Sequence, residues 1–250
     1  MKNKLGVYFT CFDELEAARV SIFYLKRVYP GIPIRLFYEG DINFKFLETE
    51  TMNLLATKEE DNLSAALKSK FDNFNPEVVK RATLDVINRL RTAIPFLNSE
   101  YILMLDPDAI VRGQLNIPDG VALLGSRVNV NHGQLDKLNQ VLTKYGGKSL
   151  EKWGATPAII NTDKFLKAME VFYKYPNLIN EMCESFYAMF AHDVLLPSIF
   201  SLIGESETFN PDIVECGRNP NWAQTTCPLV HQFTEYYPKR KTKYSSGNLI

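Results

Sequence analysis

The sequence predicts an α/β fold, in which a mixed, mostly parallel central sheet is flanked by helices within a single domain. Short apolar runs alternate along the chain with longer segments of helical periodicity, as strands and helices do around a parallel sheet. The chain opens with a strand, a helix and a second strand, which is the order of a βαβ unit. Its 250 residues, 46% of them apolar, are enough for one domain with a full core.

The opening βαβ unit covers residues 5–41. Residues 5–9 alternate as a strand does, residues 15–25 carry apolar side chains at helical spacing, and residues 34–38 form a second apolar run that ends in a turn. Open α/β sheets bind ligands beyond the carboxyl ends of their strands. The residues expected at those ends are Thr10, Cys11 and Asp41.

The middle of the chain contains one clear helix and one clear strand. Residues 43–73 are polar with a weak helical pattern, and no element is assigned to them. A helix is predicted to begin at Asn75-Pro76, with proline at the first helical position, and to end or kink at Pro95. The apolar run 101–105 predicts a strand buried on both faces.

The second half of the chain continues the same alternation. Short strands are predicted at 121–124, 158–160 and 229–232, and helices are predicted to begin near Gln134, Asp163 and Asp193.

Composition excludes several classes of function. The chain has 28 basic and 29 acidic residues, so it lacks the broad positive charge expected of a nucleic-acid-binding protein. Its four cysteines are too few for a disulfide-stapled domain. We find neither a signal-peptide pattern nor an apolar stretch of the ~20 residues that span a bilayer. We therefore expect a cytoplasmic protein with reduced thiols and no transmembrane segment; the oligomeric state stays open.

Two carboxylates, Asp106 and Asp108, follow the buried strand at 101–105. A turn lets both converge on one point, and hard oxygen ligands of this kind suit Mg²⁺ or Mn²⁺, which bind phosphates alongside one or two protein carboxylates. The alternative is that Asp106 caps a turn and Asp108 is solvated. The placement directly after five apolar residues favours the metal site.

Several segments resemble one family. Residues 101–111 resemble the D-x-D segment of GT-A-fold glycosyltransferases, particularly the glycogenin-like and bacterial galactosyltransferase-like group. Residues 7–12 resemble that group's first strand, whose end cradles the nucleotide base. Arg89 stands at the spacing of an arginine that reaches the donor, and residues 229–231 resemble a late strand whose histidine completes the metal site. The similarity runs from about residue 4 to residue 240 and implies a GT-A, Rossmann-like fold.

The resemblance implies roles for individual residues. Asp106 would bind the metal and the donor ribose, Asp108 would bind the metal, and His231 would be the third protein ligand. The residues that would line the nucleoside pocket are Thr10, Cys11 and Asp41. The resemblance also implies a donor-binding half, about residues 1–125, and an acceptor-side half, about residues 126–250.

The acceptor side departs from the family pattern. The family's D-Q-x-x-L-N helix start is similar to residues 191–196 here, with a single acid at a shifted place. Asp193 or His192 could take the proton of the acceptor hydroxyl if the reaction inverts the anomeric centre. If the reaction retains it, Asp193 would steady the cationic sugar. Helix capping by Asp193 is the structural alternative.

The expected function is metal-dependent transfer of a sugar from a nucleotide diphosphate donor, by resemblance a UDP-sugar, to a carbohydrate or other hydroxyl acceptor. Two alternatives stay open: a non-catalytic sugar- or nucleotide-binding protein of the same fold, and a phosphohydrolase of the haloacid dehalogenase type. The second fits less well, because that family places its D-x-D near the N-terminus and follows it with threonine, whereas Ala109 follows here.

Overall fold

A computed structural model describes residues 2–66, 75–125, 129–130, 133–153, 157–186, 192–210, 213–215 and 228–231. Within these ranges the main sheet has seven strands in the order β10-β6-β9-β4-β1-β2-β3. All neighbours pair in parallel except β9, which is antiparallel to both β4 and β6. The strands are β1 (Asn3–Cys11), β2 (Ile34–Tyr38), β3 (Leu54–Lys58), β4 (Ser99–Leu105), β6 (Leu123–Gly125), β9 (Ala158–Asn161) and β10 (Glu207–Phe209). The predicted mixed, mostly parallel sheet is confirmed.

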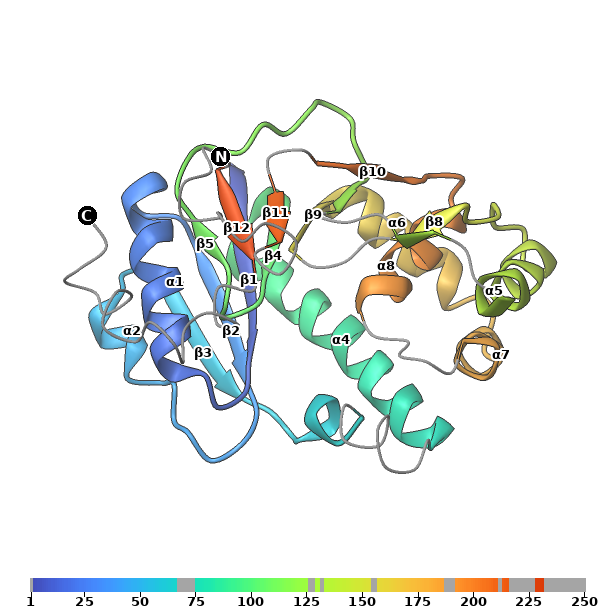
Figure 1. Ribbon diagram of the computed structural model, residues 1–250, viewed down its shortest axis with the longest axis horizontal. Coiled ribbons are helices and arrows are strands. Elements are labelled where there is room, and N and C mark those ends of the chain that lie inside the picture. The colour runs from blue at the N-terminus through green and yellow to red at the C-terminus, as the bar shows by residue number, and fades with distance from the viewer. Residues whose placement is uncertain are drawn as a thin grey trace.

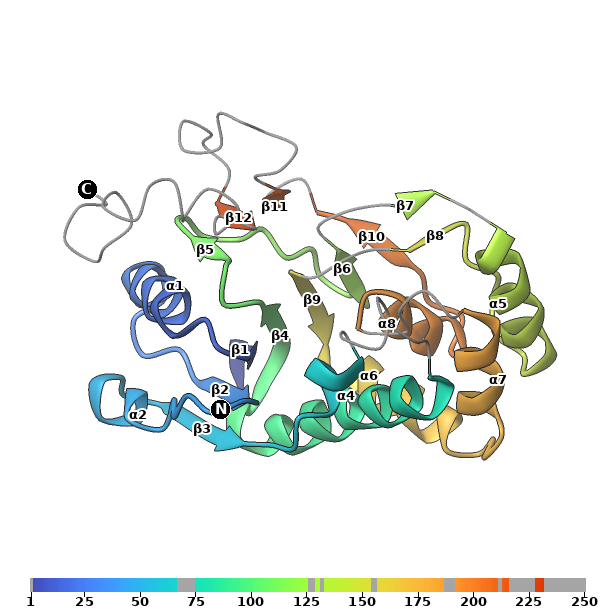
Figure 2. The ribbon, with the colours of Figure 1, turned by 60° about the horizontal axis from the view of Figure 1, so that its bottom comes forward.

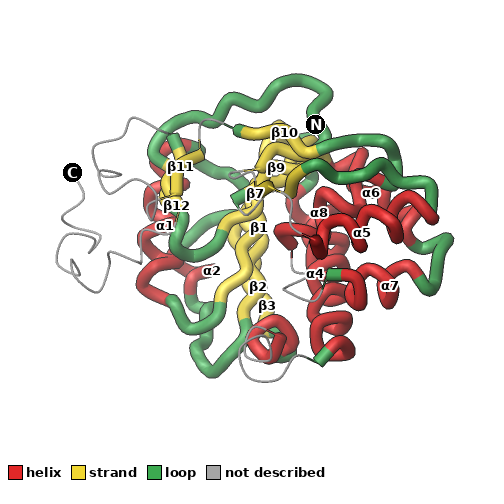
Figure 3. The backbone as a smooth tube through the Cα atoms, turned by 45° about the vertical axis from the view of Figure 1, so that its right-hand side comes forward, coloured by secondary structure: helices red, strands yellow, loops and turns green. Residues whose placement is uncertain are grey.

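Helices cover both faces of this sheet (Figure 1). One face carries α1 (Leu15–Val28) and the short α2 (Leu47–Glu50). The other face carries the remaining helices, and Figure 3 shows the sheet between the two groups. These helices are α4 (Pro76–Leu97), α5 (Gly133–Lys144), α6 (Thr162–Phe172), α7 (Leu178–Ser185) and α8 (His192–Ser201).

Strand alternation produces one apolar cluster on each face of the sheet. Val7 and Phe9 of β1 face the α1 side, whereas Tyr8 faces the α4 side. Leu103 of β4 likewise faces the α1 side, and Ile102 faces the α4 side. Because β1 is buried on both faces from Leu5 onward and β4 from Tyr101 onward, these parts of the two strands are mostly apolar, as central parallel strands are.

Helix α4 begins and ends by identifiable local signals. The Asn75 side chain accepts a hydrogen bond from the backbone N–H of Glu77 at 3.0 Å, and Pro76 takes the first helical position. Pro95 lies inside the helix, which continues to Leu97, two residues beyond the predicted end. Asn98 then adopts a left-handed conformation, with φ of 41°, and ends the helix.

Two smaller sheets lie outside the main one. The first has the order β11-β12-β5, built from β11 (Ile213–Glu215), β12 (Leu229–His231) and β5 (Ile110–Val111). The second pairs β7 (Asn129–Val130) with β8 (Lys152–Trp153). Figure 2 shows β5 and β12 together beyond the end of β4. In the described ranges, every helix is too short or too polar to cross a membrane.

Gly6 of β1 packs closely against the end of α4. A Cβ atom built on Gly6 would lie 2.9 Å from the Cβ atom of Leu97 and 2.8 Å from the Oγ atom of Ser99. The Leu97 contact involves an atom fixed to the backbone, so a rotamer change cannot relieve it.

We therefore expect Gly6→Ala to lower the free energy of unfolding by about 1–3 kcal/mol, measured by chemical denaturation. The matched control is Gly113→Ala, where the nearest atom, Cβ of Pro228, would lie 3.4 Å away, an ordinary contact. Equal stability of the two variants would contradict the close packing of β1 on the end of α4.

Candidate active site

The carboxyl ends of β1, β2 and β4 meet at one edge of the sheet. Cys11 is paired with Tyr38, and Phe9 is paired with Leu105, so the three strands end at the same level. The segments that leave this edge begin with Phe12, Glu39 and Asp106. This is the position at which open α/β sheets bind ligands.

The segment Asp106-Pro107-Asp108 forms a tight turn. The backbone N–H of Ala109 donates to the carbonyl oxygen of Asp106 at 3.1 Å, and β5 begins at the next residue. Asp106 and Asp108 are both partly exposed, whereas Pro107 between them is buried. Strand β4 ends at Leu105 and the two aspartates lie in the turn, so their carboxylates need not point to opposite faces as they would in a strand.

The last described strand, β12, lies against this turn. It pairs antiparallel with β5, with Val230 opposite Ile110 and Leu229 opposite Val111. Continuing this register by one residue places the backbone of His231 beside that of Ala109, next in sequence to Asp108. The side chain of His231 lies outside the described part of the structure. Among the described residues, no three His, Cys, Asp or Glu side chains form a metal-binding group.

The three residues predicted to line the nucleoside pocket differ in exposure. Asp41 is exposed at the sheet edge. Thr10 is 4% exposed and donates a hydrogen bond from Oγ1 to the Tyr8 hydroxyl at 3.1 Å. The side chain of Cys11 is fully buried in the apolar cluster on the α1 side, so this residue reaches the edge only through its backbone.

Burial also controls the chemistry of two thiols. Burial, with the nearby carboxylates of Glu14 and Asp106, holds the pKa of Cys11 well above its ordinary value. Burial raises the pKa of Cys183, on the other side of the sheet, to about 12. Both thiols therefore stay protonated at neutral pH and are poor nucleophiles.

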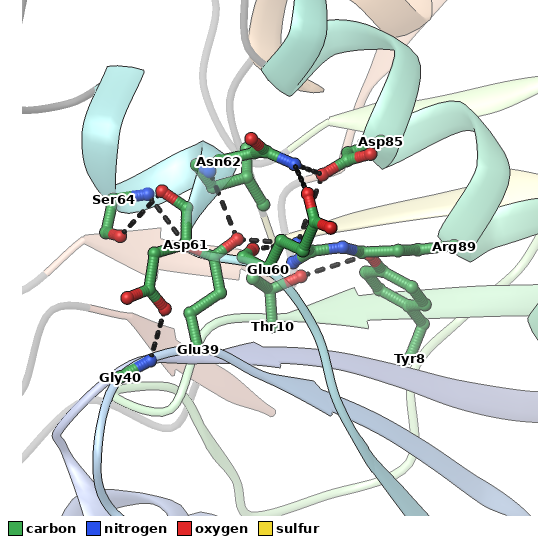
Figure 4. A network of polar contacts seen from close by, with 11 residues as sticks. Tyr8, Thr10, Glu39, Gly40, Glu60, Asp61, Asn62, Ser64, Asp85 and Arg89 are labelled. Atoms are coloured by element: carbon green, nitrogen blue, oxygen red, sulfur yellow. Dashed lines mark hydrogen bonds and ion pairs between the residues drawn. The ribbon is translucent and has the colours of Figure 1, made fainter.

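Arg89 is buried, although sequence reasoning could equally place an arginine on an exposed helix face. Its side chain is 2% exposed, and its Nη2 atom donates to Oε1 of Glu39 at 2.6 Å. The same Nη2 atom donates to the carbonyl oxygen of Glu60 at 3.2 Å and lies 3.5 Å from a carboxylate oxygen of Asp85. Figure 4 shows these residues converging from β2, α4 and the segment after β3.

Glu39 is the central residue of this network, and sequence reasoning missed it as a site residue. Its carboxylate is fully buried and also accepts the backbone N–H groups of Leu63, at 3.1 Å, and Ser64, at 2.8 Å. The available signal was a charged residue directly after a buried strand, in the turn Glu39-Gly40-Asp41. The partner is separated from it by 50 residues, which no local pattern reveals.

Further contacts tie the neighbouring residues to the same network. The backbone N–H of Gly40 donates to Asp61 at 2.8 Å, and Asn62 donates to Asp85 at 2.6 Å. Burial raises the pKa of Tyr8 to about 12, although the nearby positive charge of Arg89 acts in the opposite direction. Burial likewise raises the pKa of Glu59.

The predicted catalytic pair lies at the start of α8. His192 is the first residue of this helix and Asp193 the second. Their side chains lie outside the described part of the structure. Helix α8 packs against α6 and against β6, so the acceptor-side candidates come from the α4 side of the sheet.

Comparison with solved structures identifies the fold. The chain is similar to the galactosyltransferase LgtC in complex with donor and acceptor sugar analogues, with a TM-score of 0.54 and 13% identity, over 96% of this chain and 95% of that one. An active-site mutant of LgtC gives a TM-score of 0.49 at 14% identity, over 90% and 86% of the two chains. The bifunctional glycosyltransferase WbbM gives 0.43 at 12% identity, over 93% of this chain and 46% of that one. No family model and no curated protein sequence matches the chain.

The architecture and the position of the site therefore define an α/β protein with its candidate site at the carboxyl edge of a mixed sheet. The particular fold is the GT-A fold of glycosyltransferases, as the sequence resemblance implied.

We expect Cys11 and Cys183 to resist alkylation by iodoacetamide at pH 8 in the native protein, because both thiols are buried and protonated. Peptide mapping by mass spectrometry measures this at each cysteine, and the same protein in denaturant, where both should react, is the control. Native modification of Cys11 at the denatured rate would contradict the packing of the end of β1.

Proposed function

We propose that the protein is a metal-dependent glycosyltransferase that moves a sugar from a nucleotide diphosphate donor to a glycan or other hydroxyl acceptor. The observation that carries this proposal is the turn with Asp106 and Asp108, which lies at the ligand-binding edge of a GT-A-type sheet. The haloacid dehalogenase alternative gains no support from this fold. A non-catalytic binding protein would share the same site, and turnover separates it from an enzyme.

The side chains at the turn carry oxygen ligands that suit a hard divalent cation. Asp106 and Asp108 would supply carboxylate oxygens, and His231, the last residue of β12, would be the third ligand; β12 pairs with β5, which follows the turn directly. Oxygen-rich sites with one or two carboxylates suit Mg²⁺ or Mn²⁺. Such an ion, when bound, would neutralise charge on the leaving diphosphate as a Lewis acid.

The remaining donor contacts would come from the same edge. Thr10 and Cys11 are the last two residues of the central strand β1, and Asp41 is exposed at the same edge. Thr10 and the backbone of Cys11 would contact the donor. Asp106 would contact the ribose as well as the metal. We take a UDP-sugar with a hexose as the donor, in keeping with the galactosyltransferase similarity.

The acceptor chemistry would involve the start of α8. Asp193 or His192 would accept the proton of the attacking hydroxyl in an inverting reaction. In a retaining reaction Asp193 would instead face the positively charged sugar. Both roles need only a carboxylate or imidazole beside the sugar, and α8 lies on the α4 side of the sheet together with Arg89.

The decisive experiment is calorimetry with nucleoside diphosphates in the presence and absence of Mn²⁺. We expect one diphosphate, UDP, to bind only with the metal, and Asp108→Ala to weaken this binding at least about tenfold, or ~1.4 kcal/mol. Asp119→Ala is the matched control, because Asp119 is an exposed aspartate that pairs with Lys4 at 3.4 Å. If no diphosphate binds the wild-type protein with metal present, the proposal is wrong.

The role of His231 is tested separately. We expect His231→Gln to lower the affinity for Mn²⁺, measured by electron paramagnetic resonance of the free ion, by at least roughly tenfold, the loss seen even for outer-shell partners of a metal. An unchanged melting temperature without metal shows that β12 is intact. Unchanged Mn²⁺ affinity would remove His231 from the metal site and leave the two aspartates in place.

A further inference from the structure

A groove lies between α1 and α2, on the α1 side of the sheet. Its volume is about 570 Å³, within the range of pockets that hold small molecules. Figure 1 shows the two helices side by side on this flank of the sheet. The apolar part of the lining consists of buried Val20 and Ile22 of α1, buried Leu47 of α2, and the ring of Phe23, which is 39% exposed. The groove shares no residue with the proposed donor and acceptor sites.

The charged residues of the groove form two groups along α1. In the first half of the helix, Arg19 lies 3.4 Å from a carboxylate oxygen of Glu50 and 4.0 Å from one of Glu16, so two carboxylates balance its charge. The last turn of the helix carries Lys26 and Arg27. Neither of these two pairs with a carboxylate in the part of the chain that the structure describes. One end of the groove therefore carries two uncompensated positive charges.

Both cations keep hydrogen-bond donors that a ligand could use. The ammonium group of Lys26 donates to the carbonyl oxygen of Glu50 at 3.3 Å, which uses one of its three donors. The guanidinium of Arg27 lies over the ring of Phe23, with Cζ 5.7 Å from the ring centroid, and donates to no described residue. Cations in the last turn of a helix complement its dipole, but this leaves their donors unused. An anionic group at this end would satisfy both.

The carboxylates at the other end of the groove restrict what can bind. A surface with many anionic groups, such as a bilayer of acidic lipids, would bring like charges against Glu16 and Glu50. A ligand with a single anionic group avoids this repulsion, because it can place that group at the cationic end and apolar atoms along the rest of the groove. The charge distribution therefore favours a small molecule with one anionic end.

We propose that this groove binds a small amphiphile with one anionic head group, such as a fatty or aromatic carboxylate. The head group lies between Lys26 and Arg27, and the apolar part lies along Val20, Phe23 and Leu47. Burial of the apolar part from water supplies affinity, and charge-assisted hydrogen bonds to the two cations select the anionic head group. This site is separate from the proposed glycosyl transfer and does not depend on it.

The experiment is calorimetric titration of the whole chain with octanoate, with octanol as the neutral analogue. We expect one octanoate to bind per chain, at least about tenfold more tightly than octanol, because only the carboxylate forms charge-assisted hydrogen bonds with the two cations. Equal affinity for the two compounds, or no saturable binding of octanoate, would overturn the proposal.

Removal of the two cations locates the site. The double variant Lys26→Gln and Arg27→Gln should bind octanoate about tenfold or more weakly and keep its octanol affinity within about twofold. The matched control is Lys45→Gln with Lys58→Gln, which removes the same charge from two exposed lysines that do not line the groove. Equal losses in the two double variants would show a general effect of charge and would contradict the proposed site.

The apolar part of the groove is tested with Phe23→Ser, which should weaken the binding of octanoate and octanol alike. Because Phe23 is partly exposed, the melting temperature should change little. If the cation-free variant does not fold, the wild-type comparison of octanoate with octanol and the Phe23→Ser variant decide. Saturating UDP with Mn²⁺ should leave octanoate bound, and displacement would place the ligand at the donor edge and overturn the proposal. The octanoate titrations need no nucleotide, so they decide this inference whether or not the proposed function holds.

Discussion

The in-register parallel pairing of β1 with β2 on one side and β4 on the other is the constraint on which the rest of the structure depends. Because the pairing aligns the strand ends, it brings Cys11, Glu39 and Asp106 to one edge although they are far apart in sequence. The same pairing buries β1 on both faces, so its side chains anchor the two apolar clusters. A shift of β1 by one residue would exchange those side chains between faces and separate the edge residues at the same time.

The Glu39–Arg89 network is charged, yet it lies beside the apolar core at the same edge of the sheet. A lone buried carboxylate or guanidinium is strongly unfavourable, whereas the Glu39–Arg89 pair exchanges water for a short ion pair and two backbone N–H donors. An apolar pair of equal size could hold α4 against β2 as firmly. It could not fix the orientation of a guanidinium or hold the backbone at Leu63 and Ser64. The network thus combines burial with a fixed placement of polar groups.

Sequence reasoning succeeded where the signal is local. The strands at 5–9, 34–38 and 101–105, the start of α4 and the aspartate turn all depend on patterns within a few residues. It failed at β3, whose apolar run is too short to predict a strand. In the structure Leu54 and Ala56 are buried, whereas Leu55 is 36% exposed and Lys58 is exposed. It also missed β5 and β11, strands of two and three residues. Arg89 was placed by resemblance, but its burial and its partner depend on contacts between β2 and α4 that no sequence window contains.

The small β11-β12-β5 sheet connects the end of the described chain to the aspartate turn. Strand β5 leaves the turn, α1 packs against it, and β12 pairs with it along its length. The backbone N–H groups of Arg112 and Gly113 extend this contact by donating to the carbonyl oxygen of Pro228 at 2.6 and 3.2 Å. The turn is therefore held from both sides: β4 fixes Leu105, directly before Asp106, within the main sheet, and β12 fixes the backbone that follows Asp108. The position of the turn, and with it the position of both carboxylates, therefore depends on β12, a strand more than 100 residues further along the chain. The same pairing brings the residues of β12 close to the turn.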